Sequence, residues 1–180
     1  MKKENLFLYI LRISVTLLLI TGLVAAALAG VNNLTKDAIA ENREKKTQQA
    51  LAQVLPQAEN LQKLKVEGDA GVVTAVYKSG SSYAVEVAPM GFGGQITMMV
   101  GIEDGAVVGI SVVSHSETSG LGAVAAESSA RGETFRSQFA GQTDNLSVGD
   151  QIDSISGATI TSKAVTEGVN AALEYVKNLG

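Results

Sequence analysis

A group of hydroxyl side chains just before the last helical pattern carries the clearest chemical potential of this sequence. Residues 153–162 read Asp-Ser-Ile-Ser-Gly-Ala-Thr-Ile-Thr-Ser, and five hydroxyls fall within nine positions. The pattern indicates a strand end, a loop of small residues and a helix N-terminus, where unpaired N–H groups and the helix dipole stabilise a phosphate. Gly157 and Ala158 let a ligand approach the backbone closely. The alternative is a plain helix cap at Thr161 or Ser162.

Other site chemistries have little support. The chain has no Cys, no Trp and one His, so disulfides, thiolate metal sites and cysteine nucleophiles are excluded. His115 and Glu117 alternate and could share one face of a strand, but no third metal ligand follows at motif spacing, and a hydrogen-bonded loop histidine is the commoner outcome. Gly120-x-Gly122-x-x-Ala125 meets only half of the dinucleotide-binding fingerprint.

Composition limits the protein class. The chain has 180 residues, of which 46% are hydrophobic and 18% charged, so it is not disordered by composition. The length allows one globular domain with an appendage, or two very small domains. The net charge of −4 argues against a nucleic-acid partner, because nothing offsets phosphate repulsion.

The first thirty residues predict one transmembrane helix. Ile13–Ala29 contains no charged residue, and the apolar part of 6–11 extends it while Arg12 reaches the headgroups. The total is enough for a span of about 20 residues. A cleaved signal peptide is the alternative, supported by Lys2, Lys3 and the small-x-small sequence at 27–29. The uncharged run exceeds the usual apolar region of roughly 7–15 residues, which favours an uncleaved anchor.

The orientation of this anchor follows from size rather than charge. Lysines and arginines flank both ends of the span and give no clear bias. The short N-terminal tail cannot form a domain, whereas everything after Gly30 can. We therefore expect a cytoplasmic N-terminus and an extracytoplasmic main domain, and a cleaved signal peptide would export the same part.

The rest of the chain predicts an α+β fold: an antiparallel sheet with flanking helices, preceded by the transmembrane helix. We divide the chain into residues 1–30 (tail and anchor), 31–69 (helical stalk or linker) and 70–180 (main domain). In the stalk, Thr35 is the expected N-cap of a helix over 36–54 that Pro56 ends. Expected strands are 70–78, 82–88, 95–103 and 106–114, with hairpins at 79–81 and 104–105, and a last short strand at 151–154. Expected helices are 122–130, a short turn at 133–139, and 162–179.

The hydroxyl-rich segment resembles the flavinylation motif of the FMN-binding domain family, Asp-x-x-(Ser/Thr)-Gly-Ala-(Ser/Thr)-x-(Ser/Thr). In that family FMN is joined through its phosphate to the last hydroxyl of the motif, here Thr161, by a separate flavin transferase. The resemblance implies that the transferase recognises the motif Asp and small residues. The matching residues are Asp153, Ser156, Gly157, Ala158, Thr159 and Thr161.

Two further segments share this resemblance. Residues 91–96 (Gly-Phe-Gly-Gly-Gln-Ile) look like the Gly-aromatic-Gly-Gly segment of the family. Residues 115–122 look like its His-x-Glu-Thr-Pro-Gly-Leu-Gly segment, with Ser119 in place of Pro, which leaves the loop less rigid. The resemblance implies that this loop borders the isoalloxazine ring. Its candidate cofactor-binding residues are His115, Glu117, Thr118, Gly120, Leu121 and Gly122.

The anchor and stalk are also similar to those of the membrane-anchored G subunits of Rnf-type ion-translocating complexes, with the C subunit of the sodium-pumping NADH:quinone oxidoreductase as a relative. This implies an electron relay with covalent FMN and no substrate turnover of its own. Its partners would be flavin- and Fe–S-carrying subunits that move Na⁺ or H⁺. The alternative function is a cofactor-free, membrane-tethered binding or scaffold module.

Overall fold

The fold is taken from a computed structural model that describes residues 6–58, 60–66 and 70–179. The chain divides into two compact units, Met1–Glu44 and Lys45–Gly180. The predicted functional boundaries at residues 30 and 69 stay a prediction. Each unit is described below by itself.

The described residues of the first unit, 6–44, all belong to one continuous helix, α1, which spans Leu6–Val54. It contains an 18-residue window of mean hydropathy 2.3 with no buried residue, so the helix is long and apolar enough to cross a membrane. The hydroxyl of Thr16 donates to the carbonyl of Arg12 at 2.8 Å, which satisfies this polar group within the helix. The predicted N-cap at Thr35 is wrong: Thr35 lies inside the helix, and its hydroxyl donates to the carbonyl of Val31 at 2.9 Å.

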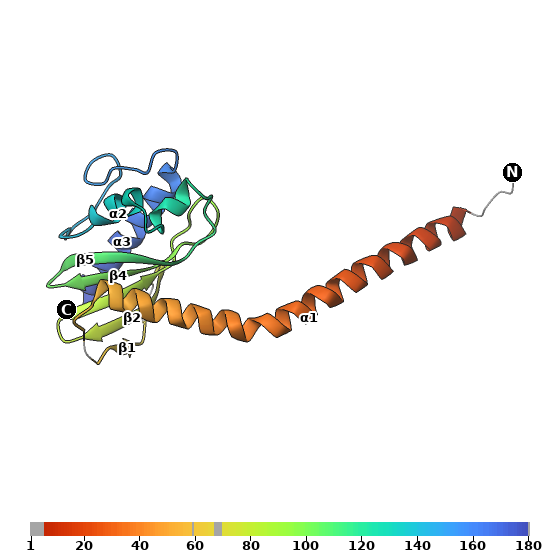
Figure 1. The fold of residues 1–180 in the computed structure, drawn as a ribbon, viewed down its shortest axis with the longest axis horizontal. Helices are drawn as coiled ribbons and strands as arrows, with labels where there is room; N and C mark the ends of the chain where they lie inside the picture. Colours follow the sequence, from red (N-terminus) through yellow and green to blue (C-terminus); the bar gives the residue numbers. More distant parts are fainter. Residues whose placement is uncertain (1–5, 59, 67–69, 180) are drawn as a thin grey trace. The chain divides into compact units, whose positions relative to one another are not determined.

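The second unit is built on a five-stranded antiparallel sheet with strand order β1-β2-β3-β4-β5, which confirms the predicted fold class (Figure 1). The strands are β1 (Gln62–Leu64), β2 (Val73–Ser79), β3 (Ser82–Val87), β4 (Thr97–Glu103) and β5 (Ala106–Ser114). The Asp104-Gly105 hairpin is confirmed, since both residues have positive φ, at 49° and 78°. Strand β1 was not predicted, and β2 and β4 begin later than expected.

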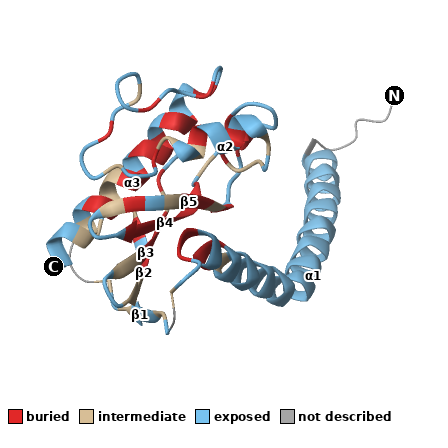
Figure 2. Cartoon of the chain, turned by 60° about the vertical axis from the view of Figure 1, so that its left-hand side comes forward, coloured by how far each residue is buried: buried red, intermediate tan, exposed pale blue. Residues whose placement is uncertain are grey.

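The two faces of the sheet bury two separate clusters, because successive side chains of a strand point to opposite sides. On β4, Met98 belongs to the main core with helix α3, whereas Met99 belongs to a smaller cluster with the last turns of α1. On β3, Val85 and Ala84 divide in the same way. Figure 2 shows that the buried part of α1 is confined to its end against the sheet.

Between β5 and the last helix, the chain departs from the prediction in three places. A short 3₁₀ helix, η1 (Gly122–Ala125), replaces most of the expected helix over 122–130. Helix α2 (Ala130–Ser137) begins earlier than expected because the Ser129 hydroxyl accepts from the N–H of Gly132 at 3.3 Å and caps it. The predicted strand 151–154 is wrong, since only a single bridge joins Val148 and Ile152.

Helix α3 (Thr159–Leu179) begins three residues before the predicted start. The residue that precedes it, Ala158, accepts the N–H of Ser162 at 3.0 Å. Neither Thr161 nor Ser162 is therefore the N-cap. Thr161 lies in the first turn, close to the positive end of the helix dipole.

Candidate functional site

A cavity of about 380 Å³ lies at the start of α3. Its walls come from three segments that are far apart in the sequence: the glycine-rich loop before β4, the loop after β5, and the first turn of α3 with the turn before it. The lining residues are Phe92, Glu117, Thr118, Leu121, Gly122, Gly157, Ala158, Thr159, Ile160 and Thr161. The fold thus brings together most of the second half of the hydroxyl-rich motif and part of the loop 115–122.

The Thr161 hydroxyl lies on the inner wall of this cavity. The side chain is only 1% exposed, and its Oγ1 donates a hydrogen bond to Oε2 of Glu117. The other carboxylate oxygen of Glu117 accepts the N–H of Gly93 at 2.8 Å. The buried Thr161 hydroxyl and the buried Glu117 carboxylate are therefore both hydrogen-bonded. Through these bonds Glu117 links the three segments that form the cavity.

The neighbouring hydroxyl has a structural task. Oγ of Ser162 accepts the N–H of Ile155 at 2.9 Å and donates to the carbonyl of Ala158 at 3.0 Å. These bonds tie the loop before α3 to its first turn. Of these two adjacent hydroxyls, Thr161 is the one that lines the cavity.

Glycines surround Glu117 because there is no room for a Cβ. At Gly122 a Cβ would lie 2.5 Å from Oγ1 of Thr161 and 3.0 Å from Cβ of Glu117. At Gly91 it would meet the Glu117 carboxylate, and at Gly93 it would collide with the backbone of Ser116. The two glycine-containing segments therefore serve the close approach of backbone to a buried carboxylate.

A tight turn delivers the chain to the first turn of α3. Gly157 has a φ of +78°, which favours glycine, and the N–H of Ala158 donates to the carbonyl of Ile155 at 2.9 Å. Thr118 forms a second turn on the opposite wall, where its carbonyl accepts the N–H groups of Leu121 at 3.2 Å and Ala123 at 3.1 Å.

Some of the predicted site residues lie elsewhere. Asp153 and Ser156 are exposed and line a second cavity of about 340 Å³, together with residues of α2 such as Arg131. The backbone of Asp153 is fixed by Gln138, whose Oε1 accepts its N–H at 2.7 Å. The motif therefore presents its first residues to one cavity and its last residues to another.

His115 also lies outside the cavity that contains Thr161. It is exposed, its Nδ1 accepts the N–H of Glu117 at 3.2 Å, and it lines a third cavity beside β5. Gly120 forms a turn with a φ of +74° and does not line the Thr161 cavity. Among the described residues, no group of three or more His, Asp and Glu side chains could hold a metal ion.

Sequence reasoning did not select Phe92 and Ile160, which line the cavity and are 71% and 55% exposed. Phe92 stands inside the Gly-Phe-Gly-Gly segment, and an aromatic residue among glycines is a usable signal. Ile160 is the residue between the two motif threonines, where any residue type is allowed. Together with Leu121, which is 43% exposed, they give the cavity an apolar rim that suits a flat aromatic ring.

The residues of the cavity therefore fit a group with an anionic end and an apolar ring system. The first turn of α3 offers unpaired N–H groups and the positive end of the helix dipole to a phosphate. The rim offers apolar contact, and Thr161 offers a hydroxyl for covalent attachment.

Comparison with known protein families agrees with a site for such a group. Residues 91–174 match the family of FMN-binding domains, and residues 1–54 match the RnfG N-terminal region. The first match contains the whole cavity, and the second covers α1. The site and fold define an FMN-binding domain behind an apolar N-terminal helix.

Relatives extend this match over almost the entire chain. The G subunit of an ion-translocating oxidoreductase complex from Methanosarcina acetivorans is 32% identical over 93% of this chain and 94% of its own length. The G subunit of the Na⁺-translocating ferredoxin:NAD⁺ oxidoreductase complex of Acetobacterium woodii is 30% identical over 94% of this chain and 93% of its own. A proton-translocating counterpart from Clostridium ljungdahlii is 44% identical over 53% of each chain. The chain belongs to the family of G subunits of the Rnf-type ion-translocating oxidoreductase complexes.

Proposed function

We propose that this protein carries FMN joined through its phosphate to Oγ1 of Thr161, and that it relays electrons between other subunits of the complex. The observation that carries the proposal is the position of the Thr161 hydroxyl. It lies in the first turn of α3, on the wall of a cavity with an apolar rim, and it is held by Glu117. Family membership supports the cofactor, and the motif supports the attachment residue.

The bound flavin supplies the redox chemistry, and the protein supplies position and electrostatics. The first turn of α3 holds the phosphate at the positive end of the helix dipole. Phe92, Leu121 and Ile160, which line the cavity, would offer apolar contact to the ring system and would keep water from part of it. Because the rim is open to solvent, a partner subunit can approach the ring without a rearrangement of the sheet.

Glu117 has different tasks before and after attachment. In the unmodified protein its Oε2 accepts a hydrogen bond from the Thr161 hydroxyl and so orients that hydroxyl. Esterification would replace the hydroxyl hydrogen with the phosphoryl group of FMN, so this hydrogen bond would be lost and Glu117 would lie beside an anionic phosphodiester. We therefore expect the loop 115–122 to change conformation on attachment, and the transferase must reach a side chain that is only 1% exposed.

We place the N-terminus in the cytoplasm and the flavin domain on the extracytoplasmic side of the membrane. The size argument from the sequence supports this orientation, and α1 is long and apolar enough to serve as the anchor. Covalent attachment suits an exported domain, because a lost cofactor could not be replaced from the cytoplasmic pool. The relatives include members of both a Na⁺-translocating and a proton-translocating complex, and the ion is moved by the complex rather than by this chain alone.

In-gel fluorescence tests the proposal. The full chain is produced with a flavin transferase, separated in SDS and viewed under ultraviolet light. Wild type and Thr161→Ser should show a flavin band, and Thr161→Ala should not. Thr143→Ala is the matched control, because Thr143 lies outside the cavity, and it should keep the band. If wild type shows no band under these conditions, the relay is wrong and the cofactor-free tethered module takes its place.

A further inference from the structure

Strand β5 forms one edge of the sheet and is its longest strand, with nine residues. Its inner side pairs with β4. On its outer side, the described residues supply backbone partners only near its start: the N–H of Val107 donates to the carbonyl of Gln142, and the N–H of Gly141 to the carbonyl of Val107, both at 2.8 Å. The stretch from Val108 to Ser114 therefore has an outer edge without a strand partner among the described residues.

This edge lacks most of the devices that keep natural edge strands from pairing. Residues 108–114 read Val-Gly-Ile-Ser-Val-Val-Ser and contain neither a charged residue nor proline. The pairing with β4 shifts register at two places, next to Val108 and Val113. Between these irregularities, residues 109–112 form a regular segment whose outward backbone groups can pair with another strand.

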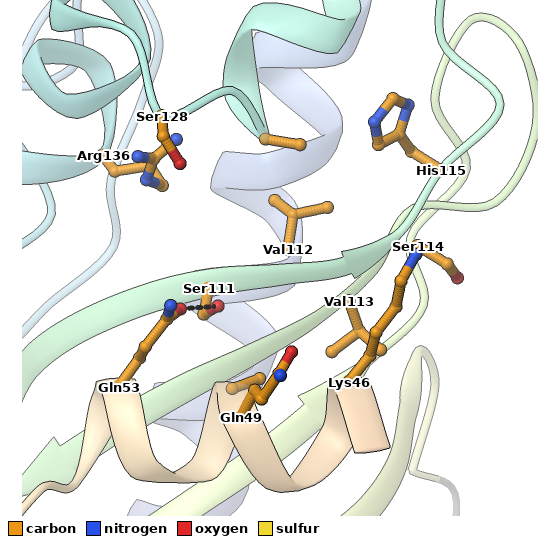
Figure 3. Close-up of a pocket in the computed structure, with 12 residues that line it drawn as sticks. Lys46, Gln49, Gln53, Ser111, Val112, Val113, Ser114, His115, Ser128 and Arg136 are labelled. Atoms are coloured by element: carbon orange, nitrogen blue, oxygen red, sulfur yellow. Dashed lines mark hydrogen bonds between the residues drawn. The ribbon is translucent and has the colours of Figure 1, made fainter. Parts of the chain in front are cut away.

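A groove of about 430 Å³ runs along the same edge, beside residues 111–115. Figure 3 shows Lys46, Gln49 and Gln53 from the end of α1 on one side of β5, and Ser128 and Arg136 on the other. The groove wall is fixed, because the Ser111 hydroxyl donates to Oε1 of Gln53 at 2.6 Å. With walls on both sides, the groove suits one extended segment better than the edge of a second sheet.

The charged residues that line the groove indicate which kind of segment would bind there. Lys46 and Arg136 line it, and no Asp or Glu is among its lining residues, although the chain as a whole has a net charge of −4. Arg136 is held in place by two hydrogen bonds of 2.9 Å from Nη1 to the carbonyls of Ala125 and Glu127. The groove therefore complements an acidic side chain next to an extended backbone.

We propose that an extended, acidic segment of another subunit of the complex binds in this groove and pairs with β5 as a sixth strand. Main-chain hydrogen bonds to residues 109–112 supply affinity, and Lys46 with Arg136 supply the charge preference. The proposal rests on membership in the complex and not on flavin attachment at Thr161. Strand β5 would then be part of the interface between this protein and another subunit of the complex.

Amide hydrogen exchange compares the assembled complex, purified from membranes in detergent, with the full-length protein by itself in the same detergent. Exchange over residues 108–114 should slow in the complex by about tenfold or more, which corresponds to about 1.4 kcal/mol of added protection. The opposite edge, β1, is the internal control and should change little. Equal exchange of residues 108–114 in the two samples would overturn the proposal.

A cross-link identifies the occupant. The chain has no cysteine, so Gln49→Cys introduces a unique attachment point in the groove, and Lys63→Cys on β1 is the matched control. The groove variant should cross-link to a different protein of the complex, at a segment containing Asp or Glu, and Lys46→Glu in the same chain should lower the yield. A cross-link to a second copy of this chain, or equal yields from both cysteines, would refute the proposal. The product should also form with Thr161→Ala, so failure of flavin attachment is distinguishable from failure of this interface.

Discussion

At the scale of single residues, the site depends on a pair that is 44 positions apart in the sequence, Thr161 and Glu117. A carboxylate that is 9% exposed is costly to bury unless its oxygens are bonded, and here the hydroxyl and the N–H of Gly93 meet that requirement. The bond therefore stabilises the unmodified domain as well as orienting the hydroxyl.

Glu117→Ala should lower the free energy of unfolding of the unmodified protein by about 1–3 kcal/mol, because it leaves the buried Thr161 hydroxyl without its acceptor and removes the bond to the Gly93 N–H. Glu117→Gln should cost less, since its amide oxygen can still accept one bond. Urea denaturation of the full chain, produced without a transferase, measures both values. Two variants as stable as wild type would show that the pair contributes nothing to the fold.

Gly122→Ala tests the close packing around this pair. A Cβ at residue 122 would lie 2.5 Å from Oγ1 of Thr161, so the loop must shift, at a cost of about 1–3 kcal/mol, and flavin attachment should decrease. Gly109→Ala is the control, because nothing lies within 4 Å of its Cβ position. Quantified flavin fluorescence per protein band compares the two variants, and equal labelling would contradict the geometry.

The residues near the attachment point illustrate what sequence can and cannot predict. The local motif predicts a helix N-terminus that carries hydroxyls, and Thr161 lies in the first turn of α3. The role of Glu117 as hydrogen-bond partner of Thr161 depends on a contact between distant segments, which no local pattern contains. For Phe92 the glycine-rich segment around it was a local signal, but the contact of its loop with the cavity depends on the tertiary fold.

At the scale of elements, alternation and turn residues predicted β2 to β5 and both of their hairpins. Strand β1 was missed because it has three residues and is mostly polar, so it has no alternating apolar pattern of its own. The start of α3 was placed too late because its first turn contains two β-branched threonines, which score poorly as helix formers. Tertiary packing of Ala158 and Thr161 overrides that preference.

Tyr77 on β2 gives an element-scale prediction. Burial raises the pKa of the Tyr77 phenol above its ordinary value of 10.0, and the nearby Glu86 carboxylate raises this pKa further. The phenol therefore loses its proton at a lower pH in the unfolded chain than in the folded protein. The contribution of Tyr77 to the free energy of unfolding is complete below pH 10.0 and is lost as the pH rises through the folded pKa. Tyr77→Phe should remove this part of the alkaline destabilisation. Urea midpoints at about pH 8 and about pH 11 measure it; an identical fall in wild type and variant would contradict the assignment.

At the scale of the whole molecule, α1 belongs to both units. Its apolar part is long enough for a membrane span, and its last turns complete the core of the second unit through Ala50, Leu51 and Val54. The anchor was predicted from composition alone. The continuity of the helix through Thr35 was not predicted, because a threonine before a polar segment resembles an N-cap. In the structure the Thr35 hydroxyl instead donates to the carbonyl of Val31, one turn earlier in the same helix.

The last turns of α1 should therefore be required by the folded domain. Leu51 is 3% exposed, and Leu51→Ala should cost about 2–5 kcal/mol, whereas Leu34→Ala, at a residue that is 84% exposed, should cost little. A fragment that begins at Lys45 should fold, and one that begins at Pro56 should not, because it exposes Ala84, Met99 and Val113. Circular dichroism with thermal unfolding compares these proteins. A stable fragment from Pro56 would contradict the two-faced core.

The most direct measurement is the mass of the peptide that contains Thr161, taken from the protein in membranes of its native host. We expect an added mass of one FMN less one water, located by fragmentation on Oγ1 of Thr161. The unmodified peptide, or the same added mass on Thr159 or Ser162, would contradict the assignment of Thr161 as the attachment residue.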